Sequence, residues 1–298
     1  MRIAIITDSY LPTTDGVVTA VLTTRRSLEA LGHTVFIIAP DPGPEYREEG
    51  VYYFPAMKLR TYEGYYIPIF PSEKVTLLKK LNPDIIQVRG VAFMAVKALI
   101  ASKQLDIPII INYDTAVTEV VDQYSPIKLS KDILVNLTKK YLRKILARAN
   151  AVIAPTNVIA KEILNDVGAL PKKIGIIPTG IDTEFFTRSD AGNPLREKYG
   201  LVGKRVLLSV GRLSVEKSVD RIIRVLRKLP EDTVLLIVGK GPMENDLKKL
   251  VEDEGLTDRV KFLGYLHGQD LVDHYSCADA YVSASMFETQ VLTVLESI

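Results

Sequence analysis

Glu288 and Glu296 lie eight residues apart near the end of the 298-residue chain, after an apolar strand-like run. A helix beginning near residue 290 would direct its free backbone N–H groups and its positive dipole end at an anionic ligand such as a diphosphate. The carboxylates before and inside that helix could accept hydrogen bonds from hydroxyl groups of the same ligand. Acidic residues also favour ordinary helix starts, so the pair alone leaves both interpretations open.

Two cations, Arg212 and Lys217, occupy a segment that follows a predicted strand and leads into a predicted helix. In open parallel sheets, ligands bind beyond the carboxyl ends of the strands. Gly211 would let a backbone approach a ligand closely, and the two cations could converge on a diphosphate. The helix dipole disfavours cations at a helix start. Their placement therefore favours an anionic ligand over ordinary loop charges.

Two further glycine loops follow strands. Gly239 belongs to a Gly-Lys-Gly-Pro loop that lacks the Gly-x-Gly-x-x-Gly pattern, because position 244 is Glu; a tight turn explains it as well as a ligand does. Gly16 follows Asp15 after the first strand and stands at a predicted helix start. It could face a phosphate from the opposite wall of a site, or Asp15 could simply cap the helix.

The elements that must position these residues alternate regularly. Strands are predicted at 2–7, 34–39, 84–88, 108–112, 151–154, 174–177, 205–210, 233–238, 259–263 and 279–283. Helices are predicted between them at 17–31, 91–104, 130–148, 156–167, 217–228, 242–255 and 268–275, with another near 290. Continuously apolar strands are typical of a parallel sheet covered on both faces. The order predicts an α/β fold of two Rossmann-like, doubly wound domains.

The domain boundary is expected within 178–192, which is rich in turn formers and charges. We place the domains at 1–184 and 185–298. The region 40–72, rich in Pro, Gly and Tyr, is expected to form irregular strands and loops. Only four strands and a short final helix are predicted after the boundary, so we expect the second domain to be incomplete, with elements missing at its C-terminal end.

Composition narrows the class of protein. With 47% hydrophobic and 25% charged residues the chain is globular, and its net charge of +2 gives no general attraction to nucleic acid. The single cysteine, Cys277, excludes an intrachain disulfide, and the three histidines are scattered, so no metal site is predicted.

The N-terminus becomes acidic too early for a signal peptide. No apolar run reaches the roughly 18 residues of a membrane span, and a cytoplasmic protein is expected.

Taken together, these motifs resemble retaining glycosyltransferase family four, whose members have the two-domain GT-B fold. The resemblance extends from residue 2 to residue 298 and is strong only as an ordered series. Its landmarks are the loop at 15–18, Pro83-Asp84-Ile85, Ala154-Pro155-Thr156, the turn at 177–182, the segment 211–217, the loop at 239–242, Phe262-Leu263-Gly264 and the pair Glu288 and Glu296.

The resemblance implies a hexosyltransferase whose second domain binds a nucleotide-sugar donor, without a metal or other cofactor. Arg212 and Lys217 would hold the diphosphate, Glu288 the sugar hydroxyls and Glu296 the ribose. The departing phosphate would help to deprotonate the acceptor. The implied donor site contains Gly16, Gly211, Arg212, Lys217, Gly239, Gly264, Tyr265, Glu288, Val291, Leu292 and Glu296; the backbone at Gly264 and Tyr265 would meet the nucleobase.

The sequence departs from the family pattern at three places near this site. Asp114 replaces a histidine that contacts the donor sugar; as a candidate catalytic residue beside Glu288, Arg212 and Lys217 it could accept a sugar hydroxyl but would repel a diphosphate. Arg89 lies in a stretch where another histidine is usual. Val291 takes the place of a glycine, and its side chain could crowd the phosphate.

The acceptor is expected to be a lipid or a sugar. The segment 58–70 mixes cations with tyrosines, and the helix at 128–148 carries many cations beside one apolar face. The residues predicted on that face are Ile133, Leu134, Leu137, Tyr141, Ile145 and Ala149. Either segment could give peripheral contact at the inner surface of a membrane, although a basic helix is more often an ordinary packing helix.

Three other interpretations compete with that of an active hexosyltransferase. The departures and the short C-terminus suit an inactive nucleotide-sugar-binding remnant of the family, and a GT-B nucleotide-sugar epimerase fits the same donor site. A dinucleotide-dependent oxidoreductase fits poorly, because Thr7-Asp8-Ser9-Tyr10 follows the first strand where a Gly-x-Gly-x-x-Gly motif would be needed.

Overall fold

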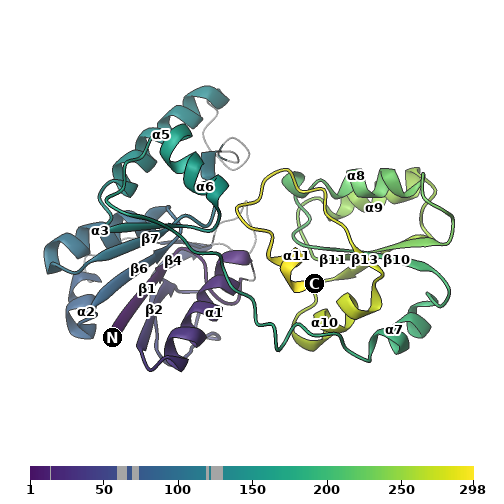
Figure 1. The fold of residues 1–298 in the computed structure, drawn as a ribbon, viewed down its shortest axis with the longest axis horizontal. Coiled ribbons are helices and arrows are strands. Elements are labelled where there is room, and N and C mark those ends of the chain that lie inside the picture. Colours follow the sequence, from purple (N-terminus) through teal and green to yellow (C-terminus); the bar gives the residue numbers. More distant parts are fainter. Residues whose placement is uncertain (14, 59–65, 69–73, 119–120, 122–129) are drawn as a thin grey trace. The chain divides into compact units, whose positions relative to one another are not determined.

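The computed structural model describes residues 1–13, 15–58, 66–68, 74–118, 121 and 130–298. They form two compact units, unit 1 at Met1–Gly180 and unit 2 at Ile181–Ile298 (Figure 1). Each unit contains a parallel sheet with helices on both faces. The predicted α/β class with two doubly wound sheets is therefore confirmed.

Unit 1 contains a seven-stranded sheet in the order β3-β2-β1-β6-β7-β8-β9, with every neighbouring pair parallel. Its strands are β1 (Arg2–Thr7), β2 (Thr34–Pro40), β3 (Val51–Phe54), β6 (Ile85–Arg89), β7 (Ile109–Asn112), β8 (Ala151–Ala154) and β9 (Ile174–Ile176). Its helices are α1 (Gly16–Ala30), α2 (Lys74–Leu81), α3 (Phe93–Leu105), α5 (Lys131–Leu146) and α6 (Asn157–Lys161), which continues as a π-helical turn at Glu162–Asp166. An antiparallel ribbon joins β4 (Ala56–Lys58) to β5 (Tyr66–Pro68).

The first strand shows why these strands are apolar throughout. Ile3 and Ile5 pack into a cluster that includes residues of α1, whereas Ala4 and Ile6 pack into a second cluster with residues of α2, α3 and α5. Successive side chains of a strand point to opposite faces, so a sheet covered on both faces requires apolar residues at every position.

Unit 2 repeats this plan with a four-stranded parallel sheet in the order β12-β11-β10-β13. Its strands are β10 (Arg205–Val210), β11 (Thr233–Val238), β12 (Val260–Gly264) and β13 (Ala280–Tyr281). Its helices are α7 (Gly192–Tyr199), α8 (Val219–Leu226), α9 (Glu244–Asp253), α10 (Gly268–Cys277) and α11 (Leu292–Glu296). Residues of α8 and α9 cover one face, and residues of α7 and α10 cover the other.

The structure changes two predicted helices near the candidate site. The helix predicted at 217–228 is interrupted at Ser218, whose left-handed φ of 48° separates a 3-10 turn, η2 (Val215–Lys217), from α8. Lys217 therefore ends a turn rather than starting a helix. The helix predicted near 290 begins at Leu292 and has five residues.

The sequence did not predict α7, which begins beside the expected boundary. Gly192 starts this helix, and a Cβ atom there would lie 2.6 Å from the carbonyl oxygen of Ser276. The helix thus depends on close packing against the end of α10, a contact that the local pattern does not reveal.

Candidate functional site

Three loops with predicted donor-binding glycines leave the carboxyl ends of the neighbouring strands β10, β11 and β12. The Gly211 amide donates a hydrogen bond to the carbonyl of Val238 at 3.0 Å, and the Gly239 amide donates to the carbonyl of Gly264 at 2.7 Å. These bonds continue the sheet beyond its regular strands. They place Gly211, Gly239 and Gly264 side by side at the edge where open α/β sheets bind ligands.

The glycine at 239 is required by the backbone beside it. A Cβ atom at this position would lie 1.8 Å from the carbonyl oxygen of Gly211, and its φ of 138° is a conformation that favours glycine. A backbone hydrogen bond joins the same two loops further along, from the Leu213 amide to the Lys240 carbonyl at 3.0 Å. The loop after β11 therefore holds the extended segment that carries half-buried Arg212.

Lys217 and Glu288, 71 positions apart in sequence, form an ion pair. The Nζ atom of Lys217 lies 2.5 Å from Oε1 of Glu288, and both side chains are mostly shielded, with 28% and 23% of their surface exposed. Nearby, the Met286 amide donates to the Glu216 carbonyl at 2.9 Å. The segment before α11 is thus joined to η2, and two of the predicted catalytic residues are brought together.

Glu296, the last residue of α11, is held by a residue that the sequence did not single out. The hydroxyl of Tyr275, in α10, donates to Oε2 of Glu296 at 2.9 Å and to the carbonyl of Thr293 at 3.3 Å. Burial raises the pKa of the Glu296 carboxyl, and the hydrogen bond from Tyr275 opposes that rise. In the sequence, Tyr275 is simply a tyrosine at the end of a predicted helix, and nothing nearby indicates that it contacts Glu296.

The remaining predicted residues of unit 2 are Tyr265, which follows β12, and Val291 and Leu292 at the start of α11. Tyr265 follows Gly264 and stacks on His267, with ring centroids 5.8 Å apart and an interplanar angle of 16°. Val291 precedes α11 with φ −86° and ψ 89°, a conformation open to any L-residue. The backbone therefore does not require the glycine that the family pattern has there, and half-buried Leu292 starts the helix.

In unit 1, two of the departures from the family pattern form one buried ion pair. Nη1 of Arg89 lies 3.2 and 3.3 Å from the carboxylate oxygens of Asp114, and the two side chains are 4% and 10% exposed. Nη2 of Arg89 also donates to the Ala20 carbonyl and to Oγ1 of Thr24, both at 2.9 Å and both in α1. Burial raises the pKa of Asp114, and the Arg89 charge opposes that rise.

This ion pair was missed because each replacement was considered alone. Opposite charges shortly after two consecutive predicted strands, 84–88 and 108–112, were a usable signal. At the start of α1, Asp15 caps the helix, and its Oδ1 accepts a hydrogen bond from the Val18 amide at 2.8 Å. Gly16 is the first residue of α1, and its contact with a donor stays a prediction.

Within the described ranges, no group of three or more His, Cys, Asp or Glu side chains is arranged to hold a metal ion. Over the same residues, no helix has the length and apolar character needed to cross a bilayer. Cys277 is buried.

Comparison with known proteins agrees with this geometry. Residues 14–185 match the Glycosyltransferase Family 4 sequence model, and residues 193–298 match that of the Glycosyl transferases group 1. Alpha-monoglucosyldiacylglycerol synthase of Streptococcus pneumoniae is 31% identical over an alignment covering 100% of this chain and 69% of the relative. GDP-mannose-dependent alpha-mannosyltransferase of Corynebacterium glutamicum is 26% identical, with 100% and 70% covered.

Solved structures give the same fold. Anabaena Alr3699/HepE in complex with UDP-glucose has a TM-score of 0.76 at 17% identity, covering 100% of this chain and 78% of the other. The two parallel-sheet units and the comparisons together identify a GT-B glycosyltransferase of the hexosyltransferase class. The chain belongs to glycosyltransferase family 4.

Proposed function

We propose that this protein transfers a hexose from a nucleoside diphosphate sugar to a lipid acceptor, with retention of anomeric configuration and without a metal ion. The supporting observation is the edge of the unit 2 sheet, where the loops after β10, β11 and β12 meet and Lys217 contacts Glu288. The lipid acceptor is favoured over a sugar because the Streptococcus pneumoniae relative is a monoglucosyldiacylglycerol synthase.

The donor would be bound by residues with separate roles. Arg212 and Lys217 would bind the diphosphate, since cations stabilise the charge that develops on a departing phosphate. Glu288 would accept hydrogen bonds from sugar hydroxyls, and Glu296 from the ribose. The backbone at Gly264 and Tyr265 would contact the base, and the amides at Val291 and Leu292 the phosphate.

The chemical step needs no nucleophile from the protein. The bond between the anomeric carbon and the phosphate oxygen breaks, and a bond to the acceptor hydroxyl oxygen forms on the same face of the sugar. The acceptor proton moves to an oxygen of the departing phosphate. The protein supplies charge: the cations stabilise the leaving group, and the Glu288 carboxylate stabilises the electron-poor sugar ring.

Asp114 would accept a hydrogen bond from a hydroxyl of the donor sugar. Gly16 would face the donor phosphate. An isolated carboxylate would repel the diphosphate, but the Asp114 charge is balanced by Arg89 at 3.2 Å. The ion pair therefore reconciles this departure from the family pattern with an anionic donor.

We also propose that unit 1 contacts an anionic lipid surface through α5. Its buried face contains Leu134, Leu142 and Ile145. Ile133, Leu137 and Tyr141, expected on that face, are instead 49%, 52% and 38% exposed. They recur every fourth residue, so they form a stripe along the outside of the helix.

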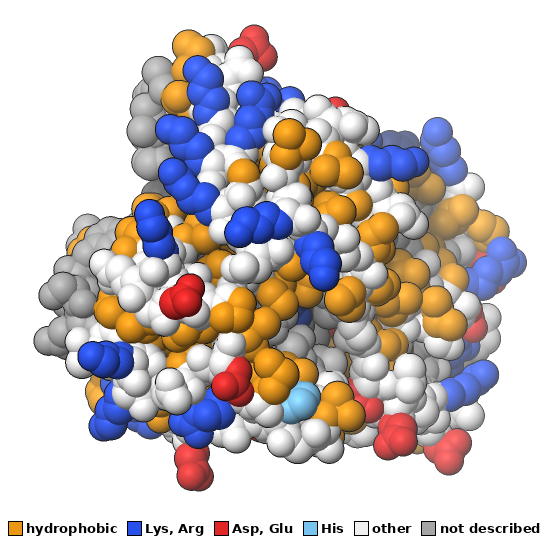
Figure 2. Space-filling model, turned by 60° about the vertical axis from the view of Figure 1, so that its left-hand side comes forward, with side chains coloured by type: hydrophobic (Ala, Val, Ile, Leu, Met, Phe, Trp, Pro, Cys, Tyr) orange, Lys and Arg blue, Asp and Glu red, His pale blue; other side chains and the backbone are white. Residues whose placement is uncertain are grey.

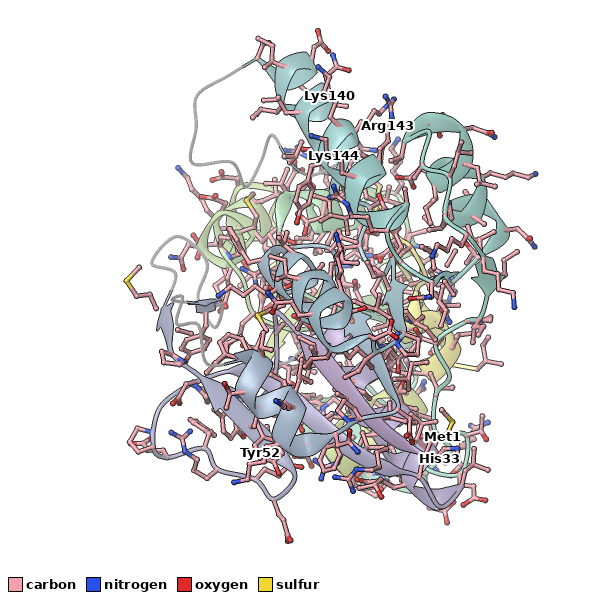
Figure 3. The ribbon with its side chains drawn as sticks, turned by 90° about the vertical axis from the view of Figure 1, so that its left-hand side faces the viewer. Met1, His33, Tyr52, Lys140, Arg143 and Lys144 are labelled. Carbon is pink, nitrogen blue, oxygen red and sulfur yellow. The ribbon has the colours of Figure 1, made fainter. Side chains whose placement is uncertain are left out.

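Cations accompany this stripe. Figure 3 places Lys140, Arg143 and Lys144 along α5, and basic side chains crowd the upper part of the face in Figure 2, above a hydrophobic area. The neighbouring helix α3 adds a second exposed stripe, Phe93, Val96 and Ile100. Apolar residues flanked by lysine and arginine suit the surface of an anionic bilayer. Of the segment 58–70 also predicted for this role, residues 59–65 and 69–70 lie outside the described ranges, as do 128–129 of the predicted helix.

The transfer is tested with UDP-glucose, GDP-mannose and related donors, offered with diacylglycerol or monoglucosyldiacylglycerol in mixed micelles containing EDTA. The expected product is a glycolipid whose anomeric configuration, measured by NMR, equals that of the donor. A product of inverted configuration, or turnover lost with EDTA and restored by manganese, contradicts the proposal. Nucleotide binding without transfer to any lipid would favour the inactive remnant.

Lipid contact is tested by sedimentation with phosphatidylcholine vesicles, with and without phosphatidylglycerol. Reversing both charges in Lys140→Glu/Lys144→Glu should weaken binding to the anionic vesicles by roughly thirtyfold or more, at about 1 kcal/mol per lysine. Lys204→Glu/Lys228→Glu makes the same charge change on exposed positions of unit 2 and should have a much smaller effect. Equal effects of the two pairs would show general charge attraction only.

A further inference from the structure

Tyr275 ties together the elements around Glu296. This residue lies in α10, and its hydroxyl donates hydrogen bonds to Oε2 of Glu296 and to the Thr293 carbonyl. Its ring packs edge-on against the ring of Phe186, with the ring centroids 6.2 Å apart. The ring of Tyr281, in β13, lies 6.3 Å away. The aromatic contacts fix the ring, so the direction in which the hydroxyl points is fixed too.

The two tyrosines support α11 differently. Tyr275 reaches the carboxylate of Glu296, whereas the Tyr281 hydroxyl lies 2.6 Å from Oγ1 of Thr293 and also donates to the Val210 carbonyl at 3.4 Å. Tyr281 thus joins α11 to the end of β10 without bonding the carboxylate. Both tyrosines therefore support α11, but of the two only Tyr275 bonds the carboxylate.

We infer that Tyr275 is a positioning residue for Glu296 and, through it, sets the preference of the donor site for ribose over a nucleotide lacking the ribose hydroxyls. This inference rests on the proposed role of Glu296 in binding the ribose. Tyr275 occupies one carboxylate oxygen, Oε2. That bond orients the other oxygen, which a carboxylate can offer to a vicinal pair of hydroxyls.

The same bond affects the charge of the carboxylate. Burial favours the neutral acid and raises the pKa of Glu296, whereas the hydroxyl of Tyr275 stabilises the charged form. Among the residues that the structure describes, the ionisable groups facing Glu296 are Tyr275 of α10 and Tyr281 of β13. Burial raises the pKa of both phenols, so both stay protonated. Without the Tyr275 hydroxyl, Glu296 would take up a proton at a higher pH and lose its capacity as a charged acceptor.

The test compares a nucleoside diphosphate with its 2′,3′-dideoxy counterpart by calorimetry, using whichever of UDP, GDP and ADP binds most tightly. The wild-type protein should prefer the ribose form by on the order of tenfold to a hundredfold, as expected for hydrogen bonds to a charged group. Glu296→Gln should remove most of this preference. Tyr275→Phe should reduce it roughly threefold or more at pH 7, and further at pH 6, while affinity for the dideoxy nucleotide stays constant.

Tyr281→Phe is the matched control, because it removes a hydroxyl that supports α11 without touching the carboxylate. It should leave the ribose preference unchanged. If Tyr275→Phe keeps the wild-type preference at both pH values, or if both tyrosine variants lower it equally, the inference is wrong although the ribose site stands. If Glu296→Gln keeps the preference, the proposed ribose site itself fails and the inference falls with it.

A double variant guards against misfolding. Tyr275→Phe alone destabilises the fold, because the buried carboxylate of Glu296 loses a hydrogen-bond donor. The double variant Tyr275→Phe/Glu296→Gln avoids this cost, because the carboxylate is replaced by a neutral amide. Because Tyr275 acts through Glu296, the double variant should show the same ribose preference as Glu296→Gln alone. A further loss in the double variant would show that Tyr275 acts independently of the carboxylate, and would overturn the inference.

Discussion

Lys217 and Glu288 are each other's charge partner, with 2.5 Å between Nζ and Oε1. One comes from the turn after β10, and the other from the segment before α11. A carboxylate beside a diphosphate would normally weaken binding of the donor by repulsion. Here the adjacent ammonium balances that charge, which would lessen the repulsion of a diphosphate bound at the proposed donor site.

The first prediction concerns Glu288→Gln. The amide keeps the size and one acceptor but removes the charge that would stabilise an electron-poor sugar in the transition state, and charge-assisted hydrogen bonds are roughly twice as strong as neutral ones. A barrier raised by about 2–3 kcal/mol lowers turnover by roughly thirtyfold to more than a hundredfold. Steady-state kinetics measure this, and calorimetry should show almost unchanged affinity for the free nucleoside diphosphate.

If Glu288 is only a helix-flanking residue, its change to glutamine should cost a few tenths of a kcal/mol of stability and leave turnover intact. Unchanged turnover in an active preparation would therefore end its catalytic assignment.

The second prediction concerns Arg212→Ala. Removing one partner of a desolvated charge pair should weaken nucleoside diphosphate binding by about 2–5 kcal/mol. Arg224→Ala is the control, because its guanidinium is 59% exposed and pairs with Glu254 between α8 and α9. Calorimetry should show normal affinity in the control; normal affinity in both variants would refute the diphosphate site.

The third prediction concerns Gly239→Ala. A methyl group here meets the Gly211 carbonyl at 1.8 Å in a φ region unfavourable to alanine, so unit 2 should lose about 2–4 kcal/mol of stability. Gly203→Ala is the control for backbone strain alone, because φ there is 74° and no atom lies within 4 Å of the added carbon. This variant should lose about 1 kcal/mol of stability. Denaturant unfolding compares them, and equal losses would show that close contact with Gly211 is unimportant.

The fourth prediction concerns the buried pair Arg89 and Asp114. Asp114→Asn leaves the guanidinium buried without its counter-charge and should cost about 3–5 kcal/mol, whereas Arg89→Met/Asp114→Leu removes both charges and should recover most of that loss. Guanidinium chloride unfolding provides the measurement. A double variant less stable than Asp114→Asn would mean that the hydrogen bonds from Arg89 to α1, rather than the ion pair, hold this region together.

Much of the fold was contained in local patterns. The apolar runs around Ile5 and Leu235 predicted strands covered on both faces, because each residue of such a strand contacts one of two clusters. The Asp15 cap was also visible, since it depends on residues close in sequence. The requirement for glycine at 239 was not, because it comes from the Gly211 carbonyl beyond the neighbouring strand. The order of Glu288 and Glu296 around α11 followed from the same local reasoning.

Within each unit, the contacts among the candidate residues were decided by tertiary structure. Lys217 reaches Glu288 across 71 positions, Arg89 reaches Asp114 across 25, and Tyr275 reaches Glu296 across 21. Each contact depends on strand order and loop path, which bring distant segments to one edge of a sheet. Local periodicity could show that the residues lie at strand and helix ends. It could not show which charges meet, because the free energy of such a pair depends on neighbours that only the folded protein supplies.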